Sequence, residues 1–369
     1  MGKYTSIDRP EDHFTTMTYT GDGSTSRALV NGGENNLKPD ILWIKKQTAA
    51  ASYYWGTSSW RTDAGDISAH LYFETDQNGA RVYDTTSGKS FDTDGFTIGQ
   101  NAGVNTNADK YIAWQFKMQG GSLTTNSDGD VNTSIQVNSD AKISSGTYVG
   151  NGTADTSFGH GLGLKPDWLF IRSYSRSEDG KVYMKGAETA NGGMQTLNEQ
   201  AVPNDSNNLM YSQPTSSVFS TGAALEVNQN NGKLVFWAMS NVQGFSKCGS
   251  FCGNGTADDG PFIYLGFTPS FVMIKRTDST NDWIIHSYKL GTNAGSGNNI
   301  GNLFNQNDCT LKANTNAQAS SYGEIDMLSN GFKVRLGGAA ENAANGKYAY
   351  LAIAIHPMVT SGGVPACAV

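Results

Sequence analysis

Residues 39–45 read Pro-Asp-Ile-Leu-Trp-Ile-Lys, an apolar run that opens with proline and closes with a basic residue. Two later stretches repeat the pattern: Pro-Asp-Trp-Leu-Phe-Ile-Arg at 166–172 and Pro-Ser-Phe-Val-Met-Ile-Lys at 269–275. Proline is common at the first residue of a strand, because it cannot donate to the ladder. A continuous apolar run is typical of a strand buried on both faces. Each run therefore predicts a central strand, and we expect its basic residue to leave the core.

A glycine-rich turn precedes each run by 16 to 18 residues, counted from the first glycine to the proline. The turn reads aromatic-X-Gly-Asx-Gly followed by Ser or Thr, and its copies occupy residues 19–24, 148–153 and 251–256. Glycine adopts positive φ without steric cost. The pattern predicts a tight positive-φ turn at the same place in each copy.

Three further landmarks follow each run in the same order. A second strand completes a hairpin, then a strand is built around a phenylalanine, and a lysine 14 or 15 residues later opens a last apolar strand. The hairpin strands are 52–55, 181–184 and 283–286, the phenylalanines are Phe96, Phe219 and Phe332, and the lysines are Lys110, Lys233 and Lys347. Five landmarks in one order, three times, predict an all-β chain of three tandem antiparallel β-sandwich repeats of jelly-roll or lectin-like type.

The landmarks set the expected boundaries. Repeat 1 covers residues 1–119, repeat 2 covers 143–243 and repeat 3 covers 244–358, with a polar linker at 120–142 and a C-terminal tail at 359–369. The tail is too weakly patterned to fold alone, so we expect it to be ordered against another chain. The repeats differ most in long excursions at about 56–90, 185–216 and 287–328, which either contain short strands or serve as binding loops.

Composition excludes several classes of function. The 369 residues contain 26 Lys and Arg against 33 Asp and Glu, a net charge of −7, which argues against nucleic-acid binding. No run approaches the ~18 apolar residues of a membrane span, so membrane insertion is not expected. Aromatic residues at 11% and hydrophobic residues at 37% argue against disorder. The four cysteines lack a disulfide or zinc pattern, and we expect reduced structural thiols.

Catalytic chemistry has little support in the sequence. Paired carboxylates carry out glycoside hydrolysis, but the acidic clusters do not recur between repeats and stand where solvated turn acids would. These clusters are Asp63, Asp66 and Glu74, Glu178 and Asp179, and Asp258 and Asp259. The five histidines have no partner at metal or triad spacing. We expect no enzymatic activity, no catalytic residues and no cofactor.

Two weaker hypotheses concern binding. Asn126, Asp128 and Asp130 alternate oxygen ligands as in a calcium loop, but the helix-loop-helix form would need Glu at position 137, where Val stands. A plain turn is the favoured interpretation, so no metal site is predicted. Trp60, Tyr72 and Tyr211 are the aromatic residues that could stack on sugar rings as binding-loop candidates, with core or interface packing as the favoured interpretation.

Several stretches resemble a repeated β-domain of structural and tail-fibre-like virion proteins of tailed bacteriophages from marine and freshwater bacteria. The resemblance covers nearly the whole chain, and its clearest segments are residues 10–14 before 19–23, 37–45, 159–166, 266–280 and 329–335. It implies a homo-oligomeric virion protein whose expected partners are other virion proteins and host surface glycan. The expected function is a tail-fibre-like or adhesin component. The alternatives are a capsid decoration, cement or head-fibre protein and, less favoured, a tailspike enzyme that degrades polysaccharide.

Overall fold

The computed structural model describes residues 5–34, 36–60, 70–290, 306–307, 309–320 and 325–365. Antiparallel strands form nearly all of its regular structure, and the helices are single turns: η1 (Pro10–Asp12), α1 (Ala102–Asn105) and α2 (Leu225–Asn228). The prediction of an all-β fold is confirmed. No helix in the described ranges has the length and apolar character needed to cross a membrane.

Three large sheets share one strand order. In each, a first strand pairs with the last, the last with the central strand, and the central strand with its hairpin partner. The first sheet is β1 (Phe14–Thr20), β9 (Lys110–Phe116), β3 (Ile41–Lys46) and β4 (Tyr54–Thr57). The second is β12 (Ile143–Val149), β19 (Lys233–Met239), β14 (Trp168–Ser173), β15 (Lys181–Met184) and β16 (Gln195–Thr196). The third is β20 (Ser246–Cys252), β28 (Lys347–Pro357), β22 (Phe267–Arg276), β23 (Trp283–Ser287) and β25 (Leu311–Lys312).

A smaller sheet covers one face of each large sheet. The first is β2 (Arg27–Leu29), β8 (Phe96–Ile98) and β7 (Gly88–Phe91), and the second is β13 (Thr156–Gly159), β18 (Val218–Thr221) and β17 (Met210–Ser212). The third is β21 (Phe262–Tyr264), β27 (Gly331–Val334), β26 (Ile325–Leu328) and β24 (Gln306–Asn307). A separate ribbon contains β5 (Leu71–Tyr72) and β6 (Val82–Tyr83). We call each large sheet with its small sheet a unit, numbered 1 to 3 in chain order.

Strand register is the same in the three large sheets. Trp43 lies opposite Trp114 and Trp55. The corresponding positions place Phe170 opposite Trp237 and Val182, and Met273 opposite Leu351 and Ile285. In each case the partner on the last strand is that strand's fifth residue, so the three central strands carry equivalent residues at equivalent positions.

The predicted glycine turns have positive φ in all three units, at Gly23, Gly152 and Gly255. Each turn is fixed by one buried asparagine. In unit 2, Asn228 accepts a hydrogen bond from the Asn151 amide and donates to Asn151 Oδ1 and the Thr153 carbonyl, at 2.8 to 3.1 Å. The same bonds join Asn105 to 22–24 and Asn342 to 254–256.

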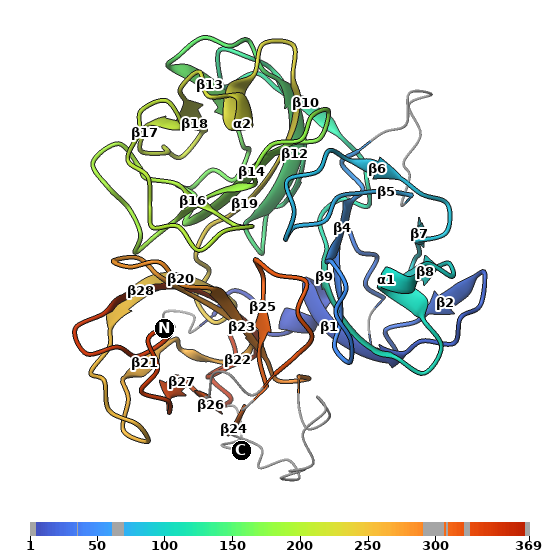
Figure 1. Cartoon of the computed structure of the whole chain (residues 1–369), viewed down its shortest axis with the longest axis vertical. Helices are drawn as coiled ribbons and strands as arrows, with labels where there is room; N and C mark the ends of the chain where they lie inside the picture. The colour runs from blue at the N-terminus through green and yellow to red at the C-terminus, as the bar shows by residue number, and fades with distance from the viewer. Residues whose placement is uncertain are drawn as a thin grey trace.

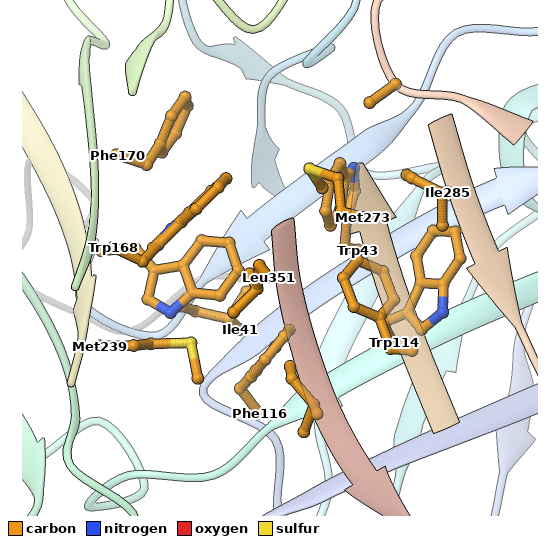
Figure 2. Packing of buried hydrophobic residues seen from close by; sticks show 14 of the residues in the cluster. Ile41, Trp43, Trp114, Phe116, Trp168, Phe170, Met239, Met273, Ile285 and Leu351 are labelled. Carbon is orange, nitrogen blue, oxygen red and sulfur yellow. The ribbon is translucent and has the colours of Figure 1, made fainter. Parts of the chain in front are cut away.

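The three units surround a common centre, with their large sheets facing it (Figure 1). Side chains alternate between the faces of a strand, so each central strand serves two cores. Leu42 and Ile44 point into the interior of unit 1, whereas Ile41 and Trp43 join a cluster shared by all three units. We call this shared cluster the central core (Figure 2). It contains all seven tryptophans of the sequence: Trp43, Trp55, Trp60, Trp114, Trp168, Trp237 and Trp283.

Residues 120–142 differ from the expected linker. They contain β10 (Thr124–Asn126) and β11 (Thr133–Asn138), which extend the large sheet of unit 2 at its β12 edge. Gln136 in β11 also donates to the hydroxyls of Ser58 and Ser59 in unit 1, both at 2.8 Å. The sequence of this stretch suggested a linker because it is polar, but the side-chain amides of Gln136 and Asn138 bond to unit 1, the latter through the Lys117 carbonyl at 3.0 Å.

The described part of the C-terminal tail lies against its own chain. Val359 bridges to Pro365, and the backbone amide of Ser361 donates to Asp8 at 2.6 Å. Residues 366–369 lie outside the described residues. Residues 359–365 thus contact the N-terminal segment, and the order of the tail against another chain stays a prediction.

Candidate functional site

One buried cation lies at each contact between units. Lys45, Arg172 and Lys275 end the three apolar runs, and all three are 0% exposed. Their side chains lie on the central-core face of the strand, because they stand two residues beyond Trp43, Phe170 and Met273. The expectation that these residues leave the core was therefore wrong. The sequence indicates where each strand ends, but it does not indicate that a neighbouring unit covers that end.

Each cation donates to backbone carbonyls of an excursion in another unit. Arg172 of unit 2 reaches the carbonyls of Glu74 and Gly79 in unit 1, both at 2.7 Å. Lys275 of unit 3 reaches the Gln200 carbonyl in unit 2 at 3.0 Å. Lys45 of unit 1 reaches the Asn316 carbonyl in unit 3 at 2.9 Å. The contacts run in one direction around the molecule and close into a ring.

The same residues stack on aromatic rings and are costly to desolvate. Arg172 lies 4.3 Å from the centre of the Phe73 ring, and Lys45 lies 4.7 Å from that of Tyr53. Burial lowers the pKa of Lys45 and of Lys275 to about 8, and that of Arg172 to about 10. Carbonyl oxygens and ring faces stabilise these cations in place of water. The excursions therefore help to hold neighbouring units together.

Trp60 cannot be the exposed sugar platform that the sequence suggested. It is 1% exposed and packs on Trp55 and Phe73, with ring centres 5.5 and 5.3 Å away, and on Tyr174 of unit 2 at 5.9 Å. Its position in a Ser-rich and Thr-rich stretch suggested a surface loop. The stretch instead lies in the contact between units 1 and 2, where the alternative of interface packing is correct.

The other two aromatic candidates lie apart from each other. Tyr72 in β5 is half-buried and stacks on Tyr54, with ring centres 4.8 Å apart. Tyr211 in β17, on the small sheet of unit 2, is 38% exposed. The three proposed residues therefore do not form one binding surface, and Tyr211 has the most accessible ring of the three.

The Asn126, Asp128 and Asp130 loop is bonded to protein groups. Asn126 Nδ2 donates to Asp128 Oδ2 at 2.8 Å, and Asp130 Oδ2 accepts from the amide and hydroxyl of Ser157 at 2.9 and 2.6 Å. The hydrogen bonds from Ser157 lower the pKa of Asp130. No cluster of three or more His, Cys, Asp or Glu side chains suited to a metal occurs within the described ranges. The loop holds β10 and β11 against β13.

Several acidic residues and histidines of the described ranges have structural partners. Asp179 lies 3.5 Å from Lys181, and Asp259 lies 2.8 Å from Lys333, which lowers the Asp259 pKa. Asp63 and Asp66 lie outside the described residues. Sequence analysis missed one pair: His286 Nε2 lies 2.6 Å from Glu341 Oε1, with both side chains almost fully buried. Such enclosure leaves no path for a substrate, so this pair is a core contact.

The surface formed by the described residues includes hollows large enough for a ligand or a side chain. One, of about 470 Å³, lies in unit 2 between Asp130, Thr147, Tyr174 and Lys233. Another, of about 500 Å³, lies in unit 3 between Lys247, Tyr264, Leu265, Met358 and Val359, and is more apolar.

The sequence contained signals for two sets of residues that were missed. Asn105, Asn228 and Asn342 each stand five residues before the lysine of the last strand, which is a threefold coincidence. The second signal is that a basic residue ends each of the three runs. This recurrence indicates a shared role, which the sequence analysis did not assign. Glu341 has no counterpart in the other units that would have singled it out.

These features define a class: an all-β chain of three sandwiches closed around one core, in which the basic residues that end the apolar runs join neighbouring units. The family model described as a domain of unknown function, DUF7483, matches residues 9–357, and the chain belongs to this family. The match spans all three units, so the family is defined by the whole ring and not by one repeat. No curated protein and no solved structure matches the chain.

Proposed function

We propose that the chain is a non-enzymatic structural protein of a tailed-phage particle. The observation that carries the proposal is the closed arrangement of the three units. The excursions are the natural place for an active-site loop, but their carbonyls accept hydrogen bonds from Lys45, Arg172 and Lys275 of a neighbouring unit. A body whose long loops are bonded to neighbouring units suits a structural protein better than an enzyme, because many enzymes need loops that close over the substrate.

Within that role, the favoured position is a tail-fibre-like or adhesin component that contacts host glycan or neighbouring subunits. Tyr211 and the groove beside Asp130, Tyr174 and Lys233 supply the aromatic and polar groups that bind sugars. Weak single contacts of this kind gain strength when many copies act together on one particle.

A second position, decoration of the capsid, is supported by the threefold arrangement of the units (Figure 1). The glycine turns at Gly23, Gly152 and Gly255 present three equivalent features around one centre. A body with this approximate symmetry can make three similar contacts with a threefold site on a shell.

The test is to locate the protein on purified particles of the phage that encodes it. An antibody against the chain, followed by gold labelling and electron microscopy, should mark the tail tip or fibres. Labelling of the head would select the decoration role, whereas particles that lack the chain by mass spectrometry would contradict a virion role.

A binding assay separates adhesion from assembly. The purified chain is applied to immobilised host surface polysaccharide, with Tyr211→Ala as the test variant and Tyr83→Ala, on a different exposed strand of unit 1, as the matched control. Selective loss of binding in Tyr211→Ala supports the adhesin role. Release of oligosaccharides by the wild-type chain would revive the tailspike alternative.

A further inference from the structure

The small sheets of units 2 and 3 end in equivalent edge strands, which differ in what bonds to their outer edges. β13 and β21 occupy the same place, because Phe158 and Ile263 lie opposite the equivalent phenylalanines Phe219 and Phe332. It follows that Ser157 corresponds to Phe262, and Gly159 to Tyr264.

In unit 2 the edge is occupied by a segment of the same chain. The Ser157 amide donates to Asp130 Oδ2 at 2.9 Å, its carbonyl accepts from the Val131 amide at 3.3 Å, and the Gly159 carbonyl accepts from Thr133 Oγ1 at 2.7 Å. The approach is close: a Cβ atom on Gly159 would meet Asn126 Oδ1. This edge position therefore accepts an extended segment.

In unit 3 the same backbone groups face outward. The Pro261 carbonyl accepts from the Val334 amide of β27, and the Leu265 amide donates to the carbonyl of Asn330, the residue before β27. By the alternation of an antiparallel ladder, the amides and carbonyls of Phe262 and Tyr264 therefore point away from β27. Among the described residues, the partner found for these four groups is Lys247 Nζ, 2.7 Å from the Tyr264 carbonyl. The edge is available for a further strand.

The side chains at this edge are apolar and large. Phe262 is 47% and Tyr264 55% exposed, where unit 2 has Ser157 and Gly159. The apolar surface continues into the 500 Å³ hollow that Leu265 and Met358 line. Exposed edge strands with aromatic side chains readily pair with another strand.

We propose that two copies of this chain pair through β21 in antiparallel fashion, with Ile263 of each copy opposite Ile263 of the other. Phe262 of one copy then faces Tyr264 of the second, which forms four backbone hydrogen bonds and two aromatic cross-strand pairs. Charge is complementary as well. Lys247, beside Tyr264, comes close to the start of the partner's β21, which follows the exposed Asp259; this carboxylate also pairs with Lys333 of its own chain at 2.8 Å.

Sedimentation equilibrium of the purified chain over a range of concentrations tests the pairing. The wild type should show a reversible increase from the 39.4 kDa of one chain to twice that mass. Phe262→Pro removes an outward amide, which an edge strand tolerates, and should abolish the dimer. Ala28→Pro, at the equivalent place on β2 of unit 1, is the matched control and should dimerise as the wild type does.

A second variant guards against misfolding. Phe262→Ser with Tyr264→Ser keeps the backbone and removes the aromatic surface, and it should weaken dimerisation at least tenfold while the melting temperature is retained. A monomeric wild type, or a dimer that persists unchanged in Phe262→Pro, overturns the proposal. The pairing deepens the self-association expected of a virion protein, but its failure would leave the location of the chain on a particle untouched, because that is measured separately.

Discussion

The central core and the three sandwich interiors are built from different residues. All seven tryptophans lie in the central core, whereas the interior of unit 2 contains Tyr148, Phe158, Phe219 and Phe236 with aliphatic residues. The sandwich interiors resemble one another because each repeats one fold. The central core instead joins three different sheets, and the large tryptophan rings fill the space between them. The units are therefore not independent domains along the chain, because their largest side chains, the tryptophans, are buried between them.

The largest expected effect comes from truncation of a ring that joins units. Trp168→Ala removes contacts with Trp237 and with Trp283 of unit 3, and should lower the free energy of unfolding by about 3 to 5 kcal/mol. Phe219→Ala, inside unit 2, should cost a similar amount. The two variants should differ in tryptophan fluorescence of the folded protein, which changes only in Trp168→Ala. Chemical denaturation with both variants checks the costs, and a cost below about 1 kcal/mol for Trp168→Ala would show that the central core contributes little.

A smaller effect is expected at the buried cations. Arg172→Met leaves the Glu74 and Gly79 carbonyls without their donor and should cost about 2 to 4 kcal/mol. Arg176→Met, on an exposed residue of the same unit, is the control and should change stability by less than about 0.5 kcal/mol. Equal effects of the two substitutions would mean that Arg172 does not join units.

The turn asparagines test whether the units are equivalent. Asn105→Ala, Asn228→Ala and Asn342→Ala each leave a turn amide and a carbonyl unpaired, and each should cost about 1 to 3 kcal/mol. Thermal or chemical unfolding of the three variants gives the comparison. If one asparagine proved dispensable, its turn would be held by other contacts and the threefold equivalence would fail there.

The last expected effect is a dependence on alkaline pH. The pKa of Lys45 and of Lys275 is about 8 in the folded chain and lies near 10.5 in the unfolded chain. Between these values the unfolded state binds more protons, so these two residues raise stability as the pH increases from about 8 to about 10.5. Below pH 8 both states are protonated and the folded state bears the desolvation cost. The nearby charges that oppose this shift are Asp76 for Lys45 and Asp282 for Lys275.

The matching variants isolate this contribution from tyrosine and cysteine titration. The stability difference between the wild type and Lys45→Met with Lys275→Met should change with pH in the wild type's favour over that window. Urea denaturation at pH 7.5, 8.5 and 9.5 measures it. A difference that stays constant with pH would place both ammonium groups in contact with water.

Much of the fold could be predicted from recurring residues. The strands around Trp43, Phe170 and Met273, the positive φ of Gly23 and the all-β class follow from local patterns that physical chemistry constrains strongly. The contacts between units could not be predicted, because nothing local states which surface will cover a strand's second face. The expected exposure of Lys45 and the expected linker at residues 120–142 were wrong for that reason. Each looks solvated in its own sequence context and becomes buried or bonded only when another unit lies against it.

The candidate binding residues were the least predictable part. Exposed aromatic residues and buried ones look alike in sequence, so Trp60 and Tyr211 were grouped although the structure separates them. The exposed edge of β21 could not be predicted, because it is recognised only by comparison with β13. The segment that bonds to the edge of β13 lies in residues 120–142, which were expected to be a linker.

One measurement tests most directly the claim that the units form a single body around the central core. Equilibrium unfolding in denaturant is followed at once by tryptophan fluorescence, which reports only the central core, and by far-ultraviolet circular dichroism, which reports the strands of all sheets. We predict coincident transitions with one midpoint, as cooperative unfolding requires. A fluorescence transition complete at lower denaturant than the loss of strand signal would show that the units separate before they unfold, and would contradict the account.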